Sequence, residues 1–337
     1  MHLRPALNSA IERFTREHVP SPRLNAELLM MFTLDCDRAY LYAHPERELT
    51  VDEIARYDAA LARRATGVPA QYITGHQEFW GMDLIVSPAV LIPRPETEHV
   101  VEAVLELVSS MEAKQDQDRS QNQDQRQNQD RSQNQDQCQN QGQSQKQDQN
   151  QNQLQDQRPR TGVSAPQGLR IVDVGTGSGA IALALARELP SAEITATDIS
   201  EDALEIARAN AARHELGSRI AFQRTDLLSG VTVGAFDFVV SNPPYVGESE
   251  EDSVQLEVRK FEPRGAVFAG PTGLEVIERL IPQAHAALRP GGWLVFEISG
   301  TIADSVRGLL AGWTGIAIKN DLQGIARVVM ARKSATH

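Results

Sequence analysis

From residue 169 to residue 331, short apolar segments alternate with helix-like segments. The pattern predicts strands at Leu169–Val174, Ala192–Asp198, Arg219–Thr225, Phe236–Ser241, Gly292–Ile298, Gly315–Lys319 and Ile325–Ala331. It predicts helices at Ala180–Leu189, Glu201–Leu216, Gly273–Leu288 and Ile302–Gly312. Such alternation predicts an α/β fold, with a parallel sheet covered by helices on both faces. Ligands of these sheets bind at the carboxyl ends of the strands, near the point where strand order reverses.

A glutamine-rich tract lies before this region. Between Gln115 and Gln157 nearly every odd position is glutamine, and the stretch Asp118–Gln125 recurs word for word at Asp130–Gln137. The tract has too little apolar surface to offset the entropy lost on ordering, so we expect disorder. Lengthening a surface loop costs little free energy, which favours a tolerated repeat expansion over a specific interaction role.

The segments before the tract differ from those after it. Residues 1–70 carry apolar side chains at near-helical spacing, such as Leu24, Leu28 and Phe32, and they predict a small helical domain. Residues 78–93 are rich in aromatic and aliphatic side chains, and Gly81 with Ser87-Pro88 indicates the turns of a β-hairpin. Pro95 suits the first turn of a helix, whose buried stripe would be Val101, Val104, Leu105 and Val108. We therefore divide the chain into a helical domain (1–75), a hairpin linker (76–96), the first helix of the main domain (97–113), the insertion (114–160) and the main α/β domain (161–337).

Composition excludes several classes of protein. The net charge of −12 argues against the broad basic face of a duplex DNA-binding protein. The two cysteines, Cys36 and Cys138, are too few for a disulfide framework or a structural zinc site, and no histidine spacing indicates a metal centre. No signal peptide and no apolar run of membrane-spanning length is present in the sequence, so we expect a cytoplasmic protein without a metal.

A glycine-rich turn follows the first predicted strand and opens a helix. Its residues are Asp173, Gly175, Thr176, Gly177, Ser178 and Gly179. Glycine allows a tight turn and a close approach of a ligand to the backbone. Asp198 ends the second strand, 23 positions after Gly175, where its carboxylate suits a pair of ribose hydroxyls. Asp226, after the third strand, suits an adenine amino group. The pattern predicts an adenosine cofactor but leaves its identity open, because Gly175, Gly177 and Ala180 also fit the dinucleotide loop of dehydrogenases.

The segment Asn242-Pro243-Pro244-Tyr245 follows the fourth predicted strand directly. The Asn242 side-chain oxygen and the Pro243 carbonyl can accept the two N–H bonds of a planar NH2 group. Tyr245 supplies a flat wall for a planar amide or base. Proline restricts its own φ and the residue before it, so the segment is stiff. We predict that it orients a planar NH2 group for reaction, since such positioning can contribute as much as ~7–11 kcal/mol to catalysis.

The glycine loop combined with Asn242–Tyr245 resembles the class I, Rossmann-like methyltransferases that modify planar NH2 groups. Further motifs resemble the release factor glutamine methyltransferases (the HemK/PrmC family). These motifs are Tyr72–Gly75 with Glu78–Gly81, Ile92–Glu98, and Glu262-Pro263 with Gly270–Leu274. The resemblance covers essentially the whole chain except the glutamine tract.

The resemblance implies specific roles for these residues. It implies that Asp173, Gly175–Gly179, Asp198, Asp226, Leu227 and Asn242 bind S-adenosyl-L-methionine, and that Asn242–Tyr245 hold the glutamine amide, with Asn242, Pro243 and Tyr245 acting in catalysis. The helical domain would grip class I peptide chain release factors, whose Gly-Gly-Gln loop presents the glutamine. We expect a monomer that binds no nucleic acid sequence-specifically. Some relatives carry tryptophan at the position of Leu227, so we expect altered cofactor affinity here.

Alternatives remain open from the sequence. A glutamine methyltransferase of ribosomal proteins would use the same chemistry, and an adenine methyltransferase of DNA or RNA would use the same loop. A non-catalytic binding protein assembled through the glutamine tract is the alternative from another class. Arg94 is predicted either to contact cofactor or substrate or to form an ion pair with Glu96 and Glu98. Trp80 is predicted as interface core rather than a substrate platform.

Overall fold

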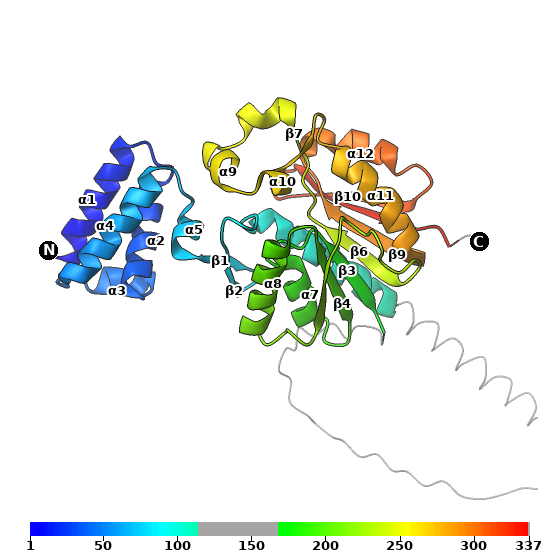
Figure 1. The fold of residues 1–337 in the computed structure, drawn as a ribbon, viewed down its shortest axis with the longest axis horizontal. Helices are drawn as coiled ribbons and strands as arrows, with labels where there is room; N and C mark the ends of the chain where they lie inside the picture. The colour runs from blue at the N-terminus through cyan, green and yellow to red at the C-terminus, as the bar shows by residue number, and fades with distance from the viewer. Residues whose placement is uncertain (114–167, 336–337) are drawn as a thin grey trace, which may run out of the picture.

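A computed structural model describes residues 1–113 and 168–335 of the chain. Figure 1 shows a group of N-terminal helices standing to one side of a larger unit built on a sheet, with a short hairpin between them. The predicted insertion at 114–160 lies outside the described residues. Within the described part of the chain, no helix is both long and apolar enough to cross a membrane.

The N-terminal group consists of α1 (Leu3–Arg16), α2 (Pro22–Leu34), α3 (Arg38–Ala43), α4 (Val51–Ala65) and α5 (Ala70–Thr74). Their shared core includes the fully buried Phe14 and Leu29 together with Tyr57. Helix α4 begins with a capping box, in which the Thr50 hydroxyl accepts from the Glu53 amide and the Glu53 carboxylate accepts from the Thr50 amide. The helical prediction for residues 1–70 is therefore right, although Leu24 and Phe32 on α2 are exposed to solvent.

The hairpin is shorter than predicted. Strands β1 (His76–Phe79) and β2 (Met82–Ile85) are joined by Trp80 and Gly81, both at positive φ, as a tight hairpin turn requires. Pairing ends at Ile85, and residues 86–94 are irregular because Pro88 and Pro93 have no N–H to continue a ladder. A 3-10 turn, η1 (Pro95–Thr97), then leads into a helix over residues 98–113, whose Val101, Val104 and Val108 are buried as predicted.

The large sheet has the strand order β10-β11-β9-β6-β3-β4-β5. Its strands are β3 (Arg170–Val174), β4 (Glu193–Asp198), β5 (Ile220–Arg224), β6 (Phe236–Ser241), β9 (Leu288–Glu297), β10 (Thr314–Asn320) and β11 (Ala326–Arg332). The prediction of a parallel sheet is wrong at one edge, where β11 runs antiparallel to both β9 and β10. The reason is the short connection at residues 321–325, since a tight turn can join only antiparallel strands.

Helices cover both faces of the sheet, as predicted. One buried cluster combines sheet residues with α7 (Ala180–Glu188) and the helix over 98–113. The opposite cluster combines them with α11 (Glu275–Ala287) and α12 (Ala303–Leu309). Helix α8 (Glu201–Arg213) follows β4 and packs against β4 and β5.

Between β6 and α11 lie short elements that the sequence pattern does not predict. These are β7 (Val246–Gly247), η2 (Glu248–Ser253), α9 (Leu256–Phe261), α10 (Arg264–Val267) and β8 (Phe268–Gly270). They are too short to carry a recognisable apolar period. Figure 1 shows α9 and α10, in yellow, on the side of the sheet unit that faces α5.

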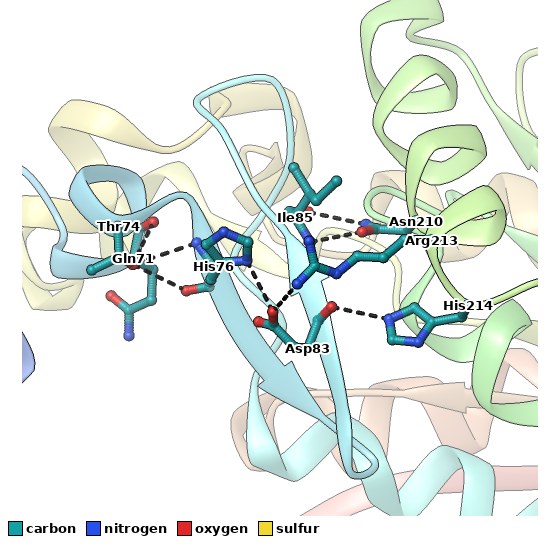
Figure 2. Close-up of polar contacts among 8 residues, drawn as sticks. All are labelled: Gln71, Thr74, His76, Asp83, Ile85, Asn210, Arg213 and His214. Atoms are coloured by element: carbon teal, nitrogen blue, oxygen red, sulfur yellow. Dashed lines mark hydrogen bonds and ion pairs between the residues drawn. The ribbon is translucent and has the colours of Figure 1, made fainter. Parts of the chain in front are cut away.

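The hairpin is fixed to the sheet unit through α8, as Figure 2 shows. Asp83 of β2 accepts from Arg213 at 2.5 Å, and its backbone carbonyl lies 2.9 Å from the His214 ring. The buried Asn210 side chain forms hydrogen bonds with both the amide and the carbonyl of Ile85. These contacts hold the hairpin against α8. They therefore set the position of Ile85, from which residues 86–97 continue.

Candidate functional site

Strand order reverses at β3. The chain runs outward from β3 to β4 and β5, then returns to place β6 on the other side of β3. Val174 at the end of β3 lies in register with Ser241 at the end of β6. The glycine loop and the Asn242–Tyr245 segment therefore emerge side by side at the switch point, where parallel sheets bind their ligands.

The glycine loop is tied to the end of β4 by its backbone. The amides of Gly175 and Thr176 both donate to the carbonyl of Thr197 at 2.9 Å. Gly175 and Gly177 lie at positive φ, and a Cβ built on either would meet no atom of the described residues within 4 Å. Because both glycines line a cavity, the space that side chains would fill is open to a ligand that lies against the backbone.

This first cavity has a volume of about 420 Å³, within the usual range for small-molecule sites. Of the residues predicted to bind a cofactor, those that line it are Gly175, Thr176, Gly177, Ser178, Asp198, Asp226, Leu227 and Asn242. Asp198 accepts from the Gly177 amide and the Ser200 amide, both at 2.9 Å. Each oxygen keeps a second lone pair for a ligand hydroxyl.

The residues predicted to meet the adenine, Asp226 and Leu227, also line the first cavity. Asp226 forms an ion pair with Arg279, which also lines the cavity and which the sequence did not single out. Leu227 lies at a φ of 53°, an unusual conformation for a non-glycine residue. Its carbonyl accepts from the Thr197 hydroxyl at 3.2 Å. Leu227, where an apolar surface is expected, therefore lines the cavity with its backbone held by the Thr197 side chain of β4.

Asp173 and Gly179 do not line the first cavity. Asp173 is buried beneath the loop, where one carboxylate oxygen accepts from the Thr176 hydroxyl at 2.6 Å and from the Ala182 amide at 3.2 Å. Its other oxygen is buried without a hydrogen-bond partner among the described residues. Burial raises the pKa of Asp173 to about 7. The geometry shows Asp173 supporting the loop from below.

A second cavity of about 510 Å³ lies on the other side of the Asn242 segment. Pro243 and Tyr245 line it, while Asn242 and Pro244 line both cavities. The Asn242–Tyr245 segment therefore forms a wall that the two cavities share. Gly273 supports this wall from behind, because a Cβ there would lie 2.6 Å from the Tyr245 carbonyl.

Asn242 and Tyr245 converge on one buried carboxylate. The Asn242 side-chain nitrogen donates to the Thr97 hydroxyl at 2.9 Å, and that hydroxyl donates to Glu297 at 2.7 Å. The Tyr245 hydroxyl donates to the other Glu297 oxygen at 2.9 Å. Burial raises the pKa of Glu297, while these two donors and Arg327 act in the opposite direction.

Sequence reasoning missed Thr97 and Glu297 as site residues, although a signal was available for Glu297. It ends β9, so it is a polar residue at the carboxyl end of a parallel strand, like Asn242 after β6. Arg94 lines the second cavity, so a contact with substrate stays a prediction, but the predicted ion pair with Glu96 and Glu98 is wrong. Arg94 pairs instead with the buried Glu262 at 2.5 Å, which also accepts from the Ile92 amide at 3.1 Å.

Trp80 is placed away from both cavities. Its indole N–H donates to Glu188 at 3.0 Å, and its ring packs against the core of the sheet unit. It is therefore interface core, as expected. Among the described residues, no cluster of histidine, cysteine, aspartate and glutamate has the arrangement of a metal site.

Comparisons with known proteins agree with this geometry. Residues 5–75 match the family described as the PrmC N-terminal domain, and residues 161–260 match the methyltransferase small domain. The chain is 48% identical over 336 residues to the release factor glutamine methyltransferase of Koribacter versatilis, covering 99% of each chain. It is 36% identical to the protein of the same name from Chlorobaculum tepidum, covering 95% of this chain and 94% of the relative.

These alignments span both the helical group and the sheet unit, and the open glycine cradle beside Asp198 fits the cofactor of such enzymes. The chain therefore belongs to the release factor glutamine methyltransferases, enzymes that depend on S-adenosyl-L-methionine.

Proposed function

We propose that this enzyme methylates the side-chain amide nitrogen of the glutamine in the Gly-Gly-Gln loop of class I peptide chain release factors. One observation carries the proposal. The wall between the two cavities presents two acceptors, the Asn242 Oδ1 and the Pro243 carbonyl, that receive no hydrogen bond within residues 1–113 and 168–335. Two such acceptors match the two N–H bonds of one primary amide.

The proposed reaction depends more on the orientation of the amide than on a general base. An amide nitrogen is a weak nucleophile because its lone pair is delocalised into the carbonyl. S-adenosyl-L-methionine, when bound, supplies an electrophilic methyl group. In the proposal, Asn242 and Pro243 hold the amide N–H bonds so that the nitrogen faces the first cavity through the shared wall. Positioning of this kind lowers the activation barrier of methyl transfer, because the orientational entropy is lost on binding and not in the chemical step.

Tyr245 has a separate proposed role. Tyr245 lines the second cavity, and its hydroxyl donates to Glu297. This hydrogen bond restricts rotation of the side chain and keeps the ring in the cavity wall. A fixed aromatic face suits the flat glutamine amide and excludes water from one side of it. After methylation the nitrogen is acidic and loses its proton readily, so no buried base is required.

The partner follows from the relatives' name. Relatives aligned along both parts of this chain are named for release factors, and the proposal extends that substrate to this enzyme. It takes the helices of residues 1–75 to be the part that grips the release factor, with residues 76–96 as the linker. It also takes the enzyme to act as a monomer in the cytoplasm, where its proposed substrate works.

A labelling experiment tests the proposal. The purified enzyme is given methyl-labelled S-adenosyl-L-methionine with a release factor, a ribosomal protein mixture or DNA in parallel. Label on the release factor is expected, and it should vanish when the loop glutamine is replaced by alanine. Label on ribosomal protein or DNA alone would refute the release factor as substrate, while no label in any arm would refute the activity.

A further inference from the structure

The Thr97 hydroxyl contacts both the Asn242 side-chain amide and the Glu297 carboxylate. Thr97 Oγ1 lies 2.9 Å from the Asn242 side-chain nitrogen and 2.7 Å from Glu297 Oε2. Thr97 is 4% exposed and Glu297 is 1% exposed, so water competes little with either contact. The three residues lie 55 to 200 positions apart in sequence and come from η1, the segment after β6 and the end of β9.

The directions of these hydrogen bonds form a relay. Both hydroxyls that meet Glu297, those of Thr97 and Tyr245, donate to its two carboxylate oxygens. A hydroxyl has one proton, and the Thr97 proton is used on Glu297. Toward Asn242, Thr97 can therefore only accept, which requires the NH2 end of the Asn242 amide.

The alternative orientation of Asn242 is penalised by the same relay. Turning the amide by 180° would bring Oδ1 against a Thr97 oxygen that has no proton left to give. Two facing acceptors would lose a hydrogen bond in a buried place, which disfavours this orientation. The relay therefore keeps Asn242 Oδ1 on the opposite side of the amide from Thr97.

We infer that Thr97 and Glu297 are positioning residues that fix the amide orientation of Asn242, and so make it an acceptor for a substrate N–H. The inference rests on the proposed function, since it concerns the same Asn242 contact. Thr97 lines the first cavity and Glu297 the second, but the role inferred for both is exerted through Asn242. A free asparagine side chain could present its NH2 group instead, which would repel the N–H bonds of a substrate amide.

Two variants test the inference. Thr97→Val keeps the shape of the side chain but removes the hydroxyl, and Thr97→Ser keeps the hydroxyl. We expect Thr97→Val to lower kcat on the release factor by ~10- to 100-fold, the range that a misplaced reacting group can cost. KM for the release factor and Kd for S-adenosyl-L-methionine should stay near wild type, and Thr97→Ser should restore most of kcat.

A double-mutant cycle separates positioning from general support of the fold. If Thr97 acts through Asn242, then Thr97→Val should have almost no further effect on kcat in an Asn242→Ala enzyme. An equal loss in both backgrounds would overturn the inference, as would a Thr97→Val enzyme with wild-type kcat. A wild-type enzyme that leaves every release factor unlabelled would instead refute the proposed function, so the two failures are distinct.

A structural readout completes the test. A crystal structure of Thr97→Val at a resolution that places hydrogen atoms, or neutron diffraction, should show the Asn242 amide in mixed orientations. The wild-type protein should show one orientation, with the NH2 group toward Thr97. A single unchanged orientation in Thr97→Val would overturn the inference even if its activity were reduced.

Discussion

The two cavities are built in different ways. One side of the first is made largely by backbone, with amides of the glycine loop bonded to the end of β4 and a carboxylate at Asp198. The second is lined by side chains that come from distant segments, such as Arg94 after the hairpin and Glu297 at the end of β9. The glycine-loop side of the first cavity is encoded in two adjacent strand–turn units, whereas the second cavity requires the complete fold.

Because the two cavities are built differently, different substitutions should impair each of them. A backbone cradle tolerates change wherever a side chain points away from the ligand, but it fails when a glycine or a strand-end carboxylate is lost. A side-chain relay fails when any one member is lost, because its hydrogen bonds depend on one another. Substitutions on the two sides should therefore affect cofactor affinity and turnover separately.

The largest expected effect is on the substrate side. Asn242→Ala removes an acceptor that we propose for the substrate amide, and loss of one such preorganised contact costs ~10²–10³ in kcat. Cofactor Kd, measured by calorimetry, should rise much less than kcat falls, although Asn242 also lines the first cavity. The exposed Asn320 on β10 offers a control, since Asn320→Ala should change neither quantity. Unchanged turnover in Asn242→Ala would contradict the assignment of the wall.

On the cofactor side, Asp198→Ala should show the opposite pattern. It removes a carboxylate that accepts from Gly177 and Ser200 and that faces the first cavity. Hydrogen bonds to charged groups contribute about 1.5–3 kcal/mol, so Kd for S-adenosyl-L-methionine should rise by about 10- to 100-fold. Turnover at saturating cofactor should fall much less than in Asn242→Ala.

The matched control for the cofactor side is Asp202→Ala. Asp202 is an exposed acid in the first turn of α8, four positions after Asp198. Cofactor Kd should not change in this variant. Equal losses of affinity in the Asp198 and Asp202 variants would indicate a general electrostatic effect and would contradict a specific contact.

Glu262→Ala should reduce stability rather than turnover per folded molecule. The Glu262 side chain is 1% exposed, and its loss leaves the buried Ile92 amide and the Arg94 guanidinium without their acceptor. An unsatisfied buried donor costs about 1–3 kcal/mol in the free energy of unfolding, measurable by urea denaturation. Glu251→Ala, at an exposed pair with Arg264, is the control and should unfold like wild type.

The smallest expected effect concerns pH. The pKa of Asp173 is about 7 in the folded protein and near 3.8 unfolded, so the folded state holds this proton more tightly. The stability gained by holding it is fully present below pH 3.8 and is lost as pH rises through 7. Between pH 6 and 8 we expect a loss of about 1 kcal/mol. Asp173→Asn, which keeps an acceptor for Thr176 and Ala182, should remove that slope, and an identical slope would contradict the burial effect.

Much of the cofactor side was predictable from the sequence, since its signals are local. A glycine loop after a strand, an acid at the end of the next strand and a stiff Asn-Pro-Pro-Tyr segment each occupy a few consecutive residues. Their roles toward cofactor and substrate stay predictions until the variants above are measured. The short elements between β6 and α11 and the end of the hairpin at Ile85 were not predictable, because no period spans them.

The sequence by itself determined the family, the alternation of strands and helices, and the residues that lie at the ends of β3, β4 and β6. Only the tertiary structure decided that Thr97 bonds Asn242, that Arg94 pairs with Glu262, and that β11 runs antiparallel. The physical reason is distance along the chain. A turn or a strand end is set by neighbouring residues, whereas the meeting of η1 with the ends of β6 and β9 depends on how the whole sheet and its helices pack.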